Sequence, residues 1–151
     1  MTHSIEHITL PTASLGTERN VTVHRFGTPG ARPKAYLHAA LHAQELPGIV
    51  VLEHLQKRLH EADAEGKIIG EIALVPFANP IGLSQQIMME AQGRYDLDTN
   101  RNYNRGFPDL IGEVVEVIAD SLTDDGDENV AVIRTAIGTA LEGRKDAREA
   151  D

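Results

Sequence analysis

The chain has 151 residues, a formal net charge of -9 and no cysteine. The length suits one domain, the acidic charge argues against a nucleic-acid partner, and the lack of cysteine excludes disulfides and thiolate metal sites. No apolar run approaches the roughly 20 residues of a membrane span, and the N-terminus does not read as a signal peptide. We therefore expect a soluble, cytoplasmic protein without a membrane or nucleic-acid partner.

The N-terminal part of the chain predicts three strands. Polarity alternates through Ile5–Leu10 and Asn20–Phe26, which is typical of half-buried strands. A loop rich in glycine and proline follows at 27–33. The apolar run Lys34–Leu41 then predicts a buried strand.

A helix and a further strand come next. Pro47 suits a first helical position, and the helical pattern continues to Ala62, with leucines at 52, 55 and 59 on the buried side. Ile68–Ala78 predicts the following strand. Strand, helix and strand in this order indicate a parallel crossover in an α/β fold.

Two polar segments follow the carboxyl ends of these strands. His42 and Glu45 come after the first strand of the crossover, and Asn79-Pro80 comes after the second. Functional side chains in parallel sheets gather beyond the carboxyl ends of the strands. We therefore expect both segments to meet at one edge of the sheet.

The rest of the chain predicts a long loop and two helices. Residues 79–107 are mostly irregular, and loops of that length are usually functional or disordered. Helices are expected at Leu110–Leu122, with Asp109 as cap, and at Val130–Leu141, with an acidic turn between them. The charged end, 142–151, predicts a frayed tail. With no repeat in the sequence, we expect 1–151 to form a single domain.

The pair His42 and Glu45 has the spacing of a zinc site. Zinc prefers histidine nitrogen and carboxylate oxygen, and His-x-x-Glu lets both side chains reach one ion from a single turn. The alternative is a polar histidine that merely meets solvent at a strand end. His38 could join the site, although a histidine inside a strand more often packs in the sheet. A second His-x-x-Glu, His3 with Glu6, lies at the terminus with no strand before it, and we attribute it to chance.

A second polar cluster runs from Arg94 to Arg105. It holds three arginines and three asparagines, at positions 94, 101 and 105 and at 100, 102 and 104. Arginine offers a planar fork for a carboxylate, and asparagine offers donors and acceptors. The alternative is an ordinary solvated loop.

Together these segments resemble the succinylglutamate desuccinylase/aspartoacylase family, which belongs with the zinc metallocarboxypeptidases. The resemblance covers about Lys34 to Phe107 and rests on four features in order: His42 to Gly48 (HAQELPG), Asn79 to Gly82 (NPIG), Arg94-Tyr95, and Asp98 to Tyr103 (DTNRNY). It implies an α/β fold with a doubly wound, mostly parallel or mixed sheet flanked by helices. That fold would be zinc-carboxypeptidase-like and, in this chain, truncated.

The resemblance also implies a zinc-dependent hydrolase that cleaves the amide bond of an N-acyl amino acid or a similar small carboxylate. His42 and Glu45 would be two of three zinc ligands. Arg94 would polarise the scissile carbonyl and stabilise the oxyanion, and Asn100 and Arg101 would hold the substrate carboxylate. Zinc would activate a water, and a glutamate would act as general base.

Other residues of the motif would support these groups. Tyr95, Asp98 and Asn102 would shape the loop, and Asp98 would orient a ligand histidine. The chain departs from the family pattern at Leu41 and Ala43, where glycines are common.

The larger departure concerns the third zinc ligand and the general base. Both are expected downstream, but the last histidine is His60, and no residue of this sequence can be assigned to either role. We therefore expect a partial catalytic domain that pairs with a C-terminal part or forms a homo-oligomer. Two other functions stay open: a non-catalytic carboxylate-binding module and a zinc carboxypeptidase acting on peptides.

Overall fold

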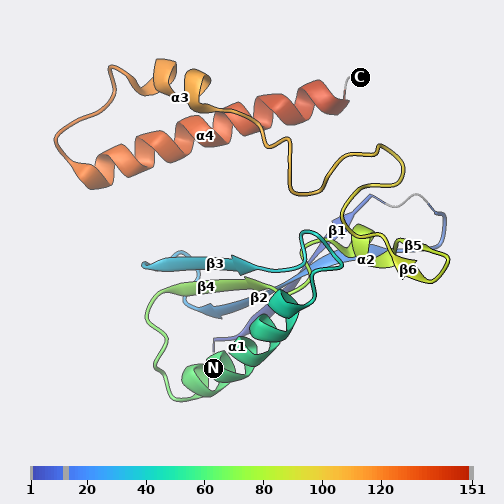
Figure 1. Ribbon diagram of the computed structural model, residues 1–151. Helices are drawn as coiled ribbons and strands as arrows, with labels where there is room; N and C mark the ends of the chain where they lie inside the picture. Colours follow the sequence, from blue (N-terminus) through green and yellow to red (C-terminus); the bar gives the residue numbers. More distant parts are fainter. Residues whose placement is uncertain (1, 12–13, 150–151) are drawn as a thin grey trace. The chain divides into compact units, whose positions relative to one another are not determined.

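The computed structural model describes residues 2–11 and 14–149 (Figure 1). The chain folds into two compact units, Met1–Gly106 and Phe107–Asp151. The elements of the first unit are β1 (Ser4–Leu10), β2 (Arg19–Gly27), β3 (Lys34–His38), α1 (Pro47–Ala64), β4 (Glu71–Val75), α2 (Pro80–Ser84), β5 (Gln86–Ile87) and β6 (Glu90–Ala91). The second unit contains α3 (Ile111–Ile118) and α4 (Gly126–Glu149). That the whole chain forms one partial catalytic domain stays a prediction.

The first unit is built on a four-stranded mixed sheet in the order β1-β2-β4-β3. β1 and β2 are antiparallel, as are β2 and β4, whereas β3 and β4 are parallel. The predicted crossover β3-α1-β4 is therefore confirmed, and so is the mixed α/β class. Helices on both faces of the sheet, the carboxypeptidase-like detail and the truncation stay predictions.

The main core lies between the sheet and α1. Phe26 of β2 and Leu74 of β4 are fully buried and pack with Ile49, Leu52 and Leu59 of the helix. These helical positions are spaced three and seven residues apart, so they share one side of α1, and that side lies on the sheet. Each fully buried side chain of this kind contributes about 1.5–3 kcal/mol of hydrophobic stabilisation. The core thus fixes the helix that starts beside the His42–Glu45 turn.

β3 differs from its prediction in length and in burial. It ends at His38 rather than Leu41, because Ala40 adopts a left-handed backbone with a φ of 57°. The strand is also mostly exposed, and Tyr36 keeps 62% of its surface in contact with solvent. The prediction of a buried strand is wrong because β3 lies at the edge of the sheet.

The segment from 79 to 107 is more ordered than predicted. It contains the short helix α2 and the hairpin β5–β6 before it becomes irregular. α2 begins where the Asn79 side chain accepts a hydrogen bond from the Gly82 N–H at 2.8 Å. A two-residue strand carries too little periodicity to be seen in sequence.

The second unit is a pair of helices in contact with each other. α3 starts at Ile111, whose N–H donates to the predicted cap Asp109 at 3.0 Å. α4 begins within the predicted acidic turn, because the Asp125 carboxylate accepts the N–H groups of Asp127 and Glu128. It continues to Glu149, past the predicted end at Leu141; the tail positions 150–151 lie outside the described residues. No helix in the described ranges is long and apolar enough to cross a membrane.

Candidate functional site

The predicted ligands His42 and Glu45 lie in the connection between the carboxyl end of β3 and the start of α1, elements that Figure 1 labels. The Glu45 N–H donates to the His42 carbonyl at 3.0 Å, which closes a tight turn just before α1. In this turn His42 Nδ1 and Glu45 Oε1 are 3.1 Å apart. The imidazole is buried, whereas the Glu45 side chain is 55% exposed. The turn therefore presents one nitrogen and one carboxylate oxygen at a single point near the surface.

Asn79 holds the ends of the two parallel strands together. Its side-chain amide donates to the Leu41 carbonyl at 2.9 Å, and its oxygen caps α2. The residue is buried, so both bonds are shielded from water. The convergence expected for the His42 and Asn79 segments is thus present in the structure.

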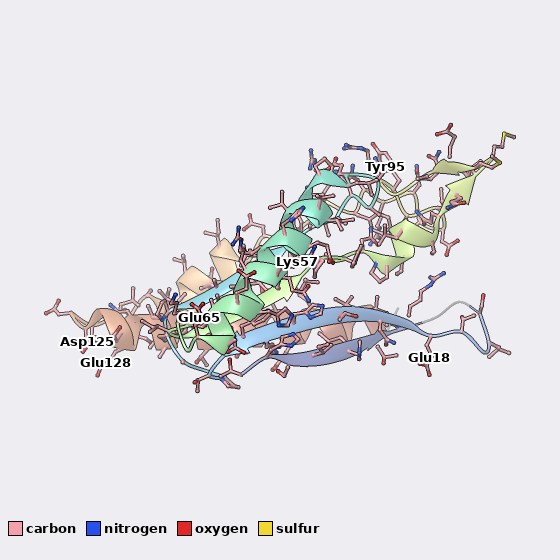
Figure 2. The ribbon with its side chains drawn as sticks, turned by 90° about the horizontal axis from the view of Figure 1, so that it is seen from below. Glu18, Lys57, Glu65, Tyr95, Asp125 and Glu128 are labelled. Carbon is pink, nitrogen blue, oxygen red and sulfur yellow. The ribbon has the colours of Figure 1, made fainter. Side chains whose placement is uncertain are left out.

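The loop that carries Arg94 passes directly over this turn. The Ala43 N–H donates to the Gly93 carbonyl at 2.8 Å. A Cβ at position 93 would lie 2.6 Å from the Ala43 Cβ and 2.7 Å from the Gln44 nitrogen, so only glycine permits this approach. Figure 2 shows Tyr95, in the same loop, at the end of the unit where α1 begins, with Glu65 at the opposite end of that helix.

Arg94 reaches the predicted ligand Glu45. Its Nη2 lies 2.8 Å from Glu45 Oε1, and both side chains are about half exposed. The guanidinium therefore stands next to the oxygen that faces His42. A molecule bound at this point would meet an imidazole, a carboxylate and a guanidinium together.

Asn102 fixes the orientation of the His42 ring. Its Oδ1 lies 2.8 Å from His42 Nε2 and also accepts the Asn104 N–H at 2.9 Å. Because a backbone N–H can only donate, the atom facing both groups is the amide oxygen, and His42 Nε2 must carry a proton. In the neutral ring the lone pair then lies on Nδ1, toward Glu45.

Asp98 was expected to orient a ligand histidine, but in the structure it does not contact His42. The Asp98 N–H donates to Asp96 Oδ1 at 3.2 Å, within the loop. No hydrogen bond joins Asp98 to His42 among the described residues. The residue that contacts the histidine is Asn102, four positions further along the chain.

Two hollows border these groups. A cavity of about 560 Å³ is lined by His42 and Glu45 and also by His38 and Asn104. A second, of about 340 Å³, is lined by Arg101, Asn102, Arg105 and Gly106. The predicted carboxylate-binding residue Asn100 lines neither; it has a φ of 55°, and its N–H donates to the Asp96 carbonyl.

The structure places Asn104, which the motif assignment did not include, beside His42. The dipeptide Asn-Arg occurs twice, as Asn100-Arg101 and as Asn104-Arg105. The sequence alone does not say which of the two dipeptides lies nearer to His42. In the structure Asn104 lines the cavity with His42. The described residues hold no group of three histidine, aspartate or glutamate side chains suited to a metal ion.

Comparison with known proteins identifies the family. The model of the succinylglutamate desuccinylase/aspartoacylase catalytic domain matches residues 31–134. A search of curated proteins finds no match.

Solved structures of several bacterial proteins have a similar fold. A protein assigned as succinylglutamate desuccinylase/aspartoacylase from Shewanella frigidimarina NCIMB 400 is 25% identical with a TM-score of 0.73, over 100% of this chain and 39% of that one. A protein of the same family from Shewanella amazonensis SB2B is 24% identical with a TM-score of 0.61, over 89% and 43%. The ectoine utilization protein EutE (DoeB) from Ruegeria pomeroyi, solved with product bound, is 25% identical with a TM-score of 0.50, over 72% and 31%.

The chain therefore spans less than half the length of each of these three structures. Its family match includes His42, Glu45, Arg94 and Asn102, the residues that the structure brings together. On the strength of a match over more than half of its residues, the chain belongs to the succinylglutamate desuccinylase/aspartoacylase family.

Proposed function

We propose that this chain contributes the first part of a zinc-dependent deacylase site, which hydrolyses the amide bond of an N-acyl amino acid or a similar small carboxylate. The observation that carries the proposal is the 3.1 Å separation of His42 Nδ1 and Glu45 Oε1 beside the Arg94 guanidinium. Family membership supports the class of reaction, since desuccinylases and aspartoacylases are hydrolases of N-acyl amino acids.

The two ligand groups at the turn, a histidine nitrogen and a carboxylate oxygen, suit zinc. Zinc takes histidine nitrogen and carboxylate oxygen, and two ligands of one ion lie about 3 Å apart. His42 and Glu45 would hold the ion, with the His42 lone pair directed by Asn102. Bound zinc would supply a polarised carbonyl and a water of lowered pKa. The third ligand and the general base have no assigned residue in the described part of the chain.

Arg94 is suited to stabilise negative charge on the substrate. Its guanidinium contacts Glu45 but remains 43% exposed, so some of its N–H groups are free to face a bound molecule. A donor of this kind stabilises the oxyanion that forms as the amide carbonyl is attacked, and its loss typically lowers kcat about 10²–10³-fold. Arg94 would thus act on the reacting carbonyl rather than on the distal carboxylate.

The distal carboxylate has two candidate anchors. Asn100 and Arg101 were predicted from the motif, whereas Asn104 lines the His42 cavity and Arg105 lines the second cavity together with Arg101. We expect Arg101→Gln to weaken binding of N-acetyl-L-aspartate about 10–100-fold, because a charge-assisted hydrogen bond is lost. Arg105→Gln is the matched control with a smaller expected effect, measured by isothermal titration calorimetry. The reverse ranking would assign the role to Arg105.

The central experiment measures zinc and activity in the same preparation. Mass spectrometry should find zinc bound to the purified chain and lost in His42→Ala. Hydrolysis of N-succinyl-L-glutamate and N-acetyl-L-aspartate, compared with a peptide that has a free C-terminus, separates a deacylase from a carboxypeptidase. Binding of these acids without zinc would instead support the carboxylate-binding module, a second candidate favoured by the presence of only two ligand groups among the described residues.

A further inference from the structure

Gln85 lies at the end of α2, immediately before β5, and its half-buried side chain contacts one loop at four points. Its Nε2 donates to the carbonyls of Gln92 and Tyr95, at 2.8 Å each. Its Oε1 accepts the Leu97 N–H at 3.0 Å and the Tyr103 hydroxyl at 3.1 Å. A glutamine amide offers two donors and two acceptor lone pairs. The hydrogen-bonding capacity of this side chain is therefore fully used on residues 92–103.

That loop carries two of the groups at the site. Arg94 comes two residues after Gln92, the first residue bonded to the Gln85 side chain, and Asn102 directly precedes Tyr103, the last. Within the loop, Asp96 and Arg101 are joined by a backbone hydrogen bond of 2.8 Å, and Arg94 and Tyr103 by one of 3.1 Å. The loop thus keeps its own shape, whereas the Gln85 side chain ties it to α2.

The ion pair at the site is by itself a weak restraint on the loop. The Arg94–Glu45 ion pair is about half exposed on both sides, and exposed ion pairs are screened by salt and worth little. Tyr103, by contrast, is partly buried, and this burial raises the pKa of its hydroxyl, which therefore stays a donor to Gln85 at neutral pH.

We propose that Gln85 is a positioning residue of the site: through its four hydrogen bonds it holds the loop so that Arg94 meets Glu45 and Asn102 meets His42. The part of this inference that concerns catalysis rests on the proposed function. The part that concerns the loop depends on the contacts alone. Gln85 touches no reacting group; it acts through Arg94 and Asn102.

Glutamine is the side chain that these four partners require. In Gln85→Glu the shape is kept, but a carboxylate would face the two carbonyls that the amide now bonds. In Gln85→Ala all four partners lose their bond and meet water. We therefore expect the isosteric change to disturb the loop at least as much as the truncation, which is the opposite of a simple packing role.

The first experiment follows the loop in the 151-residue chain. Amide hydrogen exchange by NMR should show Leu97 exchanging about tenfold faster or more in Gln85→Ala and Gln85→Glu. Tyr103→Phe removes one of the four bonds and should give a smaller increase. Gln86→Ala, the exposed neighbour in β5, is the matched control and should leave the exchange rate unchanged. Equal exchange in wild type and both Gln85 variants would overturn the proposal.

The second experiment tests whether Gln85 acts through Arg94. Calorimetry of N-acetyl-L-aspartate with Gln85→Ala, Arg94→Ala and the double variant forms a double-mutant cycle. A positioning role predicts that the double variant loses no more affinity than the single variant with the larger loss. Additive losses would overturn it. If wild type binds no N-acyl amino acid, the proposed function fails, and the exchange rates alone decide whether Gln85 holds the loop.

Discussion

The Asn102 amide oxygen determines which nitrogen of His42 faces Glu45. It accepts from His42 Nε2 at 2.8 Å and from the Asn104 N–H at 2.9 Å. A metal ligand is oriented in the same way in many zinc sites, where a hydrogen bond at one ring nitrogen fixes the lone pair on the other. A residue that binds no metal itself can therefore set the metal affinity.

Replacing Asn102 should weaken zinc binding. In Asn102→Ala the His42 ring loses its acceptor and can take either tautomer, so we expect the zinc affinity to fall about 10–100-fold. Asn102→Asp keeps an acceptor at the same place and should retain the affinity. Competition with a chromogenic chelator measures both, and ¹⁵N chemical shifts of the His42 ring report the tautomer without metal. Asp98→Ala is the control, and an equal loss of zinc there would contradict the role given to Asn102.

At the scale of elements, the residues just before β1 are fastened to the end of α1 by hydrogen bonds to the buried carboxylate of Asp63. The Asp63 carboxylate accepts the N–H groups of Thr2 and His3 at 2.7 and 3.1 Å, and also the Thr2 hydroxyl. The His3 ring stacks on Phe26, and its Nε2 lies 3.3 Å from His24 Nδ1. The N-terminal strand is thus held where two histidines lie in contact.

This arrangement makes the free energy of unfolding depend on pH. Burial lowers the pKa of His3 and of His24, and a neighbouring histidine lowers each further (His60 for His3, and His3 for His24); Asp63 and Glu53 act in the opposite direction. The pKa of each ring is lower in the folded than in the unfolded state. The stability that the neutral rings contribute is therefore fully present when the pH is above 6.5, the ordinary pKa of histidine. It is lost as the pH falls below 6.5.

We expect the melting temperature of the chain to fall as the pH is lowered from 7 through the histidine range. In His24→Phe the fall should be smaller, because the half-buried imidazole that must be protonated is gone. His54→Phe is the matched control, since His54 is an exposed residue of α1 and the slope should not change. Thermal unfolding followed by circular dichroism from pH 7 to pH 5 gives the comparison, and identical slopes in wild type and His24→Phe would contradict the assignment.

The sequence was informative wherever the determining contacts are local. Pro47 and the leucines of α1 predicted the crossover helix, and the His42–Glu45 spacing predicted two side chains on one turn. The end of β3 could not be predicted, because it depends on the left-handed backbone of Ala40, a conformation that alanine rarely adopts. Asn102 was not recognised as the partner of His42 because the two are 60 positions apart in sequence.

At the scale of the whole molecule, the sheet ends at an exposed strand. β3 pairs with β4 on one side, and no strand in the described ranges pairs with its other side. Exposed edges of this kind favour pairing with further strands. The expected homo-oligomer, or pairing with a C-terminal part that carries the third ligand and the base, remains a prediction for which β3 offers a surface.

The division into two units predicts that the site survives without the helical pair. Both apolar cores consist of residues between Val21 and Ala78, and the groups around His42 all precede Gly106. A chain cut after Gly106 should therefore unfold cooperatively and keep the zinc affinity of the full chain within about twofold, since every residue named at the site belongs to the first unit.

The helical pair should behave differently when it is made alone. Ile111 and Val117 of α3 are 73% and 67% exposed, so this unit buries little apolar surface. Two helices with so small a core cannot offset the conformational entropy of folding, and we expect 107–151 to be largely unfolded in water. Circular dichroism and chelator competition on both pieces decide the question. Loss of zinc binding in 1–106 would show that the second unit supports the site, as a single catalytic domain over 1–151 requires.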